Sequence, residues 1–424
     1  YNLSEESFVK SLNTFDLLKL RASWGKMGNQ EIGQLGLYDY IPLISIISDN
    51  ANNAIPYPIG SPNAGLIGVN ANPASVDRTW ETIENKNIGV DMALLGSRLN
   101  FSFDYYNKTN NDMLVDIAVP ATYGGKAPSS NQGKLVTKGF ETSVTWKDKV
   151  GDFRYSVSLQ LSDSKNKLVD LKNLDNYQEG LNKFRQGYGI WSYFGYVYQG
   201  IIQIQEQLHN YKKLTGLPAR VAIGDVMYRD VDGDGKLTAF GDKSKGLNGD
   251  MVYLGNLIPR YTFSSNISVG FKQLDLQVFL QGVGKRDVRY EGNIATPNTF
   301  YWPSLSYYNG KTWTPERTDA KFPRYLPGGV GYDDIRSYDY RASSLTMQNV
   351  AYLRFKVITL GYNLPASVAN SLKMKTARIF FSGQDLFTIS KGTFGGNFDP
   401  EDGFRNEGTY PFNKVYSLGL TVKF

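Results

Sequence analysis

The last residues of the chain, Tyr416-Ser-Leu-Gly-Leu-Thr-Val-Lys-Phe424, alternate between apolar and polar side chains without a break. Successive side chains of a β-strand point to opposite faces of a sheet, so this stretch is predicted to be a strand with one apolar face. The apolar face carries Tyr416, Leu418, Leu420, Val422 and Phe424.

The same alternation recurs along the chain. It is clear in 99–105, 155–161, 263–271 and 274–280, and weaker in 18–24, 88–94, 140–146, 353–360 and 377–381. We therefore expect about twelve strands. Alternation of this kind suits either a soluble sandwich with a dry core or a membrane barrel whose apolar face meets lipid.

Three features favour the barrel. The predicted strands are about nine to eleven residues long, which matches a tilted crossing of a bilayer. Many apolar faces end in Tyr, Phe or Trp, as an interfacial girdle would. Short connections, 96–97 and 147–153, alternate with long ones, near 41–79, 165–187, 203–250 and 286–340. We predict an all-β fold, a transmembrane antiparallel barrel with long extracellular loops.

Composition excludes several kinds of chemistry. The 424 residues carry a formal net charge of +6 with 20% charged residues, which is too weak an excess to indicate nucleic-acid binding. Cysteine is absent, so disulfides, thiolate metal sites and cysteine nucleophiles are excluded. The single histidine, His209, lies in a polar run of helical character without catalytic partners. We predict that the chain is not an enzyme.

Several collinear stretches then suggest a family. They include Leu20–Asn29 (LRASWGKMGN), Gly224–Leu237 (GDVMYRDVDGDGKL), Asn349–Pro365 (NVAYLRFKVITLGYNLP) and the terminal Tyr410–Phe424. In this order, and over nearly the whole chain, the sequence resembles the C-terminal half of SusC/RagA-type TonB-dependent outer-membrane transporters.

The resemblance implies a bacterial outer-membrane barrel of about 22 strands. It also implies a plug inside the barrel, energy supplied by TonB through the plug, and a SusD-type surface lipoprotein as partner. Residues 1–424 are then interpreted as the C-terminal part of the barrel, with the plug and the N-terminal barrel strands outside this chain. The implied function is TonB-dependent import of large nutrients, such as glycan or peptide oligomers.

Two other functions are kept as alternatives. A TonB-dependent siderophore or cobalamin receptor would have the same fold but no SusD-type partner. A secreted soluble β-sandwich binding protein would have the same alternation but a dry core, and it would stay in solution without detergent.

A candidate metal site lies in Asp230-Val-Asp-Gly-Asp-Gly-Lys-Leu-Thr238. The carboxylates of Asp230, Asp232 and Asp234 and the backbone carbonyl of Lys236 match the start of an EF-hand-type calcium loop. The twelfth position is glycine, so the last ligand is expected one residue late, at Asp242. The alternative is an Asp/Gly-rich surface turn whose side chains cap their own backbone.

Aromatic residues gather in a loop that could contact substrate or a partner. These candidates are Tyr301, Trp302, Tyr307, Tyr308 and Trp313. Exposed rings can stack on sugar faces or pack against a partner protein. The alternative is a loop whose rings pack on one another or lie among lipid headgroups.

Two features near the C-terminus complete the predictions. Phe424 ends the last alternating stretch on its apolar face, and we interpret it as a signal for outer-membrane assembly. Asp399, Glu401 and Asp402 lie close together and are interpreted as a loop turn, not as an acid/base pair.

Overall fold

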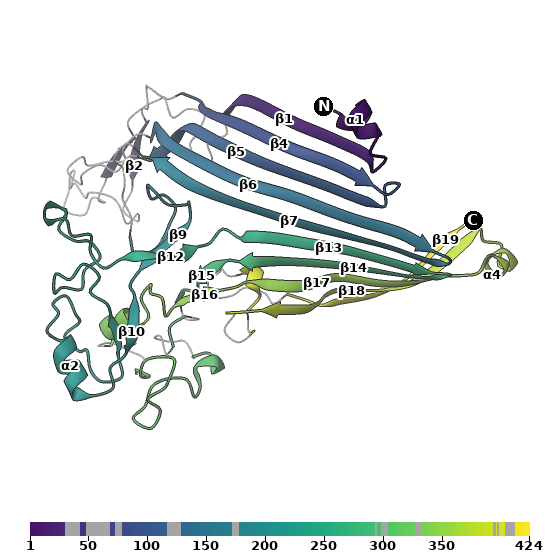
Figure 1. Ribbon diagram of the computed structural model, residues 1–424. Coiled ribbons are helices and arrows are strands. Elements are labelled where there is room, and N and C mark those ends of the chain that lie inside the picture. The colour runs from purple at the N-terminus through teal and green to yellow at the C-terminus, as the bar shows by residue number, and fades with distance from the viewer. Residues whose placement is uncertain are drawn as a thin grey trace.

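A single large antiparallel sheet dominates the computed structural model (Figure 1). The structure describes residues 1–424 apart from 30–42, 48–67, 73–78, 117–128, 172–177, 293–294, 298–303, 327–331, 393–395, 397 and 403–411. The ten strands of the sheet, in order, are β1 (Phe15–Asn29), β4 (Glu81–Leu94), β5 (Leu99–Asp116), β6 (Ser129–Val150), β7 (Phe153–Asp170), β13 (Arg260–Phe271), β14 (Leu274–Lys285), β17 (Tyr352–Asn363), β18 (Thr376–Ser390) and β19 (Val415–Lys423).

Each strand of this sheet pairs with its neighbours in the order of the chain. We expected about twelve strands; ten lie in the sheet, and they contain all the alternating stretches named above. The sheet is curved but not closed, since β1 and β19 form its two edges (Figure 1). The prediction of an antiparallel all-β fold is confirmed, as an open part of a barrel.

One face of the sheet is apolar and the other is polar, and each strand contributes residues to both. In the β4–β5 pair, Val90 faces Phe103 on one side, whereas Gly89 faces Asp104 on the other. Large apolar side chains on the first face are open to the surroundings, with Leu418 80% and Leu420 64% exposed. A sandwich would cover this apolar face with a second sheet. An apolar surface of this extent marks an interface with another molecule or with a membrane.

Ion pairs and glycine shape the polar face. Arg21 on β1 donates to Asp91 on β4 at 2.8 Å and to Asp104 on β5 at 2.7 Å. A Cβ atom on Gly89 would lie 2.5 Å from Oδ1 of Asp104 and 2.9 Å from Cζ of Arg21. A larger residue here would therefore displace the guanidinium group of Arg21 and the carboxylate of Asp104 from these positions.

The connections at the two ends of the sheet are unequal. At one end, short turns of residues 95–98, 151–152 and 272–273 join strand to strand. At the other end, the described residues of 178–256 and 286–350 form a folded unit, which we call the loop module (Figure 1). Its elements are β8 (Gly180–Asn182), β9 (Ser192–Gly195), β10 (Tyr198–Ile201), α2 (Gln205–Tyr211), β11 (Val226–Tyr228), β12 (Val252–Asn256), β15 (Asp287–Arg289), α3 (Asp333–Asp339) and β16 (Met347–Asn349).

Smaller elements complete the described chain. They are α1 (Ser7–Lys10) beside β1, the hairpin of β2 (Leu43–Ile47) and β3 (Gly68–Asn72), and α4 (Ala366–Ser371) between β17 and β18. Among the described helices, none has both the length and the apolarity needed to cross a membrane.

The loop module has its own core, in which buried tyrosines bond to one another. The hydroxyl groups of Tyr211 and Tyr338 are 2.6 Å apart, and the backbone N–H of Tyr228 donates to the Tyr211 hydroxyl at 2.8 Å. All three side chains are buried among Ile202, Val226 and other apolar groups. The predicted helical run around His209 is α2 of this module.

Candidate functional site

Three carboxylates converge in the loop module. Asp230 and Asp232 follow β11, and Asp250 lies just before β12. One oxygen of each lies within 4.8 Å of the others. Asp250 is fully buried, while the other two are half-buried. Carboxylates this close repel one another unless a proton or a cation offsets their charge.

Backbone N–H groups hold these carboxylates in place. Asp230 accepts from Gly233 at 2.7 Å, and Asp250 accepts from Val231 at 2.6 Å and from Thr238 at 2.8 Å. Oδ1 of Asp232 is buried and has no hydrogen-bond partner in the described part of the structure. Burial, followed by the charges of Asp230 and Asp232, raises the pKa of the Asp250 carboxyl.

The predicted calcium ligands are only partly brought together. Oδ1 of Asp234 accepts from the backbone N–H of Lys236 at 2.8 Å, and Asp234 is not one of the three converging residues. Asp242 lies apart, bonded to Ser244 and paired with Lys245 at 3.2 Å. The residue that joins the group is Asp250, which sequence reasoning missed because it lies well outside the twelve-residue EF-hand template.

The aromatic residues predicted to contact substrate or a partner pack inside the loop module, as far as the structure describes them. Tyr308 is buried, packs edge-on against Phe322 at 4.9 Å and donates to a backbone carbonyl at 2.6 Å. Tyr307 packs edge-on against Tyr308 at 5.8 Å, and Nε1 of Trp313 donates to a glutamine at 2.7 Å. Tyr301 and Trp302 lie outside the described residues.

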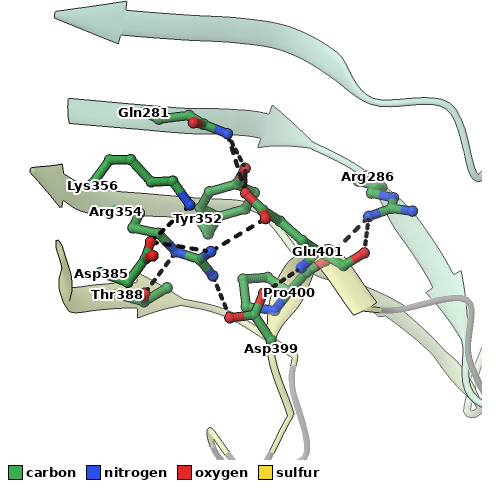
Figure 2. Close-up of polar contacts among 10 residues, drawn as sticks. All are labelled: Gln281, Arg286, Tyr352, Arg354, Lys356, Asp385, Thr388, Asp399, Pro400 and Glu401. Atoms are coloured by element: carbon green, nitrogen blue, oxygen red, sulfur yellow. Dashed lines mark hydrogen bonds and ion pairs between the residues drawn. The ribbon is translucent and has the colours of Figure 1, made fainter. Parts of the chain in front are cut away.

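A second polar cluster lies on the polar face of the sheet (Figure 2). Arg354 of β17 is only 1% exposed. Its guanidinium group donates to Asp399 and to the hydroxyl of Thr388, the latter at 3.0 Å, and pairs with Glu401 at 3.3 Å. Asp385 of β18 lies 3.8 Å from the same group. A buried arginine is thus surrounded by three carboxylates.

Further hydrogen bonds hold the turn that carries Asp399 and Glu401. Glu401 accepts from the hydroxyl of Tyr352 at 2.7 Å and from Gln281 at 3.1 Å. Arg286 donates to the backbone carbonyls of Pro400 and Glu401 at 3.2 Å (Figure 2). The prediction of a loop turn at this point is confirmed, since Pro400–Asp402 forms a short 3-10 helix. Nothing in the local sequence indicated its attachment to β17.

A third cluster of charges is buried in the loop module. Asp225 accepts two hydrogen bonds from Arg324, at 2.6 and 3.0 Å, and Asp339 accepts from the backbone N–H of Val226 at 3.0 Å. Both carboxylates are fully buried. Burial, followed by the charge of Asp225, raises the pKa of Asp339 well above its ordinary value. One arginine offsets only one of the two negative charges, which favours the protonated form of Asp339.

Phe424 follows β19 directly and is 77% exposed. It continues the alternation of β19, whose Tyr416, Leu418 and Leu420 are also exposed.

Comparison with known proteins identifies the family. Residues 11–304 match the family model described as TonB dependent receptor-like, beta-barrel. The chain belongs to the TonB-dependent receptor family. This receptor chain therefore has the barrel fold that the alternation and the resemblance predicted.

Relatives with known names support the same assignment. The receptor chain is 27% identical to TonB-dependent receptor P3 of Formosa agariphila, over all of its own length and 41% of that protein. It is 26% identical to TonB-dependent receptor SusC of Bacteroides thetaiotaomicron, over all of its own length and 39% of SusC. The chain thus spans about two fifths of the length of these relatives.

Solved structures show the same fold. The receptor chain superposes with a TM-score of 0.73 on a chain of the RagAB peptide transporter, at 20% identity, over all of its own length and 42% of that chain. The predicted resemblance to SusC/RagA-type transporters is confirmed.

The Arg354 cluster gives a first prediction. Replacing Arg354 with Met leaves Asp399 and Glu401 without their cation, whereas Asp385 keeps Lys356 at 2.9 Å, so we expect the receptor to lose about 3 kcal/mol of stability. The turn at 398–402 should detach, and limited proteolysis should cut the β18–β19 connection faster. Arg154→Met, which removes an exposed arginine of β7, is the control. Equal cleavage of both variants would contradict the role of Arg354.

The buried carboxyl of Asp339 gives a second prediction. Because folding raises its pKa, its contribution to stability is present at low pH and is lost as the pH rises through the raised value. The thermal stability of the loop module should therefore fall as the pH rises from the ordinary range of a carboxyl group through this raised pKa. Asp339→Asn, which mimics the protonated acid, should flatten this profile, whereas Asn at the exposed Asp319 should leave it unchanged. If Asp339→Asn keeps the pH profile of the wild type, the carboxyl group of Asp339 is not the cause of the pH dependence.

Proposed function

We propose that this chain forms the wall and the long loops of an outer-membrane receptor that imports large nutrients with energy from TonB. The observation that supports this best is the open sheet with one exposed apolar face and one polar face, in a chain of this family. The apolar face suits lipid, and the polar face suits a wet lumen. Transport does not require any covalent bond of the cargo to break.

Closure of the barrel requires strands from elsewhere in the receptor. The outer edges of β1 and β19 carry backbone N–H and C=O groups that must find partners inside a bilayer. The relatives are more than twice as long as this chain. We propose that the remaining barrel strands and a plug come from the rest of a longer receptor, and that TonB acts through the plug. Phe424 would then serve assembly of the last strand.

The class of cargo is proposed from the relatives. The matching structure is named for a peptide transporter, and SusC is among the relatives. We propose glycan or peptide oligomers as cargo and a SusD-type surface lipoprotein as partner on the side of the loop module. A siderophore or cobalamin receptor without such a partner is the alternative.

Uptake by cells tests this proposal. Deletion of the full-length receptor should abolish uptake of labelled glycan or peptide oligomers, and loss of TonB should do the same. Uptake of ferric siderophore and of cobalamin should be unchanged. Purification of the tagged receptor in detergent should recover a surface lipoprotein in equal amount. Loss of siderophore or cobalamin uptake, with no lipoprotein recovered, would favour the alternative.

We also propose that the loop module binds calcium. The support is the spacing of Asp230 and Asp232 with glycine at the turn, the approach of buried Asp250, and the unpartnered Oδ1 of Asp232. Oxygen ligands of this kind suit a hard divalent cation. The cation would offset the repulsion within the group and order the segment between β11 and β12.

Substitution of the converging carboxylates tests the calcium proposal. Asp230→Asn, Asp232→Asn and Asp250→Asn together should abolish calcium binding by the full-length receptor in calorimetry. The same variant should lose the rise in melting temperature that calcium gives to the wild type. Asp242→Asn, which alters a carboxylate outside the group, should bind as the wild type does. Unchanged calcium uptake by the triple variant would overturn the assignment.

A further inference from the structure

Lysines form a row across neighbouring strands on the apolar side of the sheet. The register pairs Trp24 with Lys86, Lys86 with Asn107, Asn107 with Lys138, and Lys138 with Lys165. The five residues belong to β1, β4, β5, β6 and β7, which are neighbouring strands of the sheet (Figure 1). We call Lys86, Lys138 and Lys165 the lysine row.

The positive charge of the lysine row is poorly offset. All three side chains are exposed, and Lys138 and Lys165 have no ion-pair partner in the described part of the chain. Lys86 pairs with Glu84 at 3.1 Å, and that carboxylate also accepts from Trp24. Like charges on directly opposed residues of two strands destabilise a sheet. The pairing of Lys138 with Lys165 in the strand register therefore favours an anion from outside the chain.

Further lysines strengthen the charge. One row nearer the long connections, Lys26 faces Glu84, and Lys167 lies opposite Val136. The other nearby acid, Asp163, is already held by two hydrogen bonds from Arg260. The surface thus has five lysines and one acid that is not held by an arginine.

The lysine row lies at the edge of the apolar band. One step toward the short turns, the register places Ile88, Tyr105 and Phe140, and apolar residues continue to Leu94. Lys86 lies eight positions from Leu94 along β4, about 27 Å at ~3.4 Å per residue. A tilt of about 40° reduces this to about 21 Å across the membrane, close to the height of an apolar band.

A shallow groove runs from the lysine row into the apolar band. It has a volume of about 570 Å³, and its apolar lining includes Ala22, Trp24, Ile88 and Tyr105. Lys86 lines the same groove. An apolar floor with a cation beside it suits a molecule with an acyl chain and an anionic head.

We propose that the lysine row binds the phosphate groups of lipid headgroups in the outer leaflet, with an acyl chain in the groove of Trp24, Ile88 and Tyr105. The inference rests on the proposed function, because it requires the apolar face to lie in a membrane with the long connections outside. The chemistry is charge pairing at the interface, where each lysine adds to the attraction for anionic lipid. The site would be a specific contact between the receptor and its membrane.

Lipid binding by the full-length receptor in detergent tests this inference. The probes are diphosphoryl lipid A, the same lipid without phosphate, and inorganic phosphate. The wild type should bind only the first. The variant Lys86→Gln, Lys138→Gln, Lys165→Gln should bind it more weakly, by about fivefold for each lysine removed. High salt should weaken binding by the wild type.

A matched control uses the opposite face of the same strands. Lys108, Lys147 and Lys149 are exposed lysines of β5 and β6. By the alternation of side chains along a strand, they lie on the face opposite to the lysine row. Their change to Gln should leave lipid binding unaltered. Equal binding of inorganic phosphate or of phosphate-free lipid, or unchanged binding by the lysine-row variant, would overturn the inference. A receptor that folds and dissolves without detergent would instead overturn the proposed function.

Discussion

Pairing of backbone groups between neighbouring strands is the constraint on which this structure depends. In a bilayer no water can satisfy an unpaired N–H or C=O group, so every strand must lie between two others. Pairing in the order of the chain meets this requirement for the eight inner strands of the sheet, whereas β1 and β19 form its edges. The period of two then places most apolar side chains of a strand on one face. Fold, orientation and the polar lining all follow from that register.

Sequence reasoning recovered what depends on local periodicity. The alternation from Tyr416 to Phe424 identified β19, and the weaker alternation at 18–24 identified part of β1. It also located α2 and the turn at Pro400. In each case the signal lies within a few neighbouring residues, because side-chain direction alone decides the pattern.

Contacts between distant segments could not be predicted in this way. Asp250 joins Asp230 only because the chain returns to the same point before β12. Asp399 meets Arg354 from a different strand connection, and no spacing rule links the two. The packing of Tyr308 on Phe322 could not be told from an exposed ring by composition alone. These residues are fixed by topology, which a single sequence does not display.

Charged clusters have different arrangements in the two regions of the molecule. On the sheet, Arg21 and Arg354 tie strands and a turn together through carboxylates from several segments. In the loop module, Arg324 bonds to the carboxylate of Asp225, while burial raises the pKa of the neighbouring Asp339. Removing one partner of such a group is costly, so each cluster specifies one arrangement of its segments.

The loop module is built from two stretches of chain separated by the β13–β14 hairpin. Asp225 belongs to the first stretch, whereas Arg324 and Asp339 belong to the second. Neither stretch can bury its charged groups alone. During evolution the two stretches must therefore change together, and a recombination event that exchanges one without the other would leave an orphaned charge in the core. The two stretches form one inherited unit although the chain divides them.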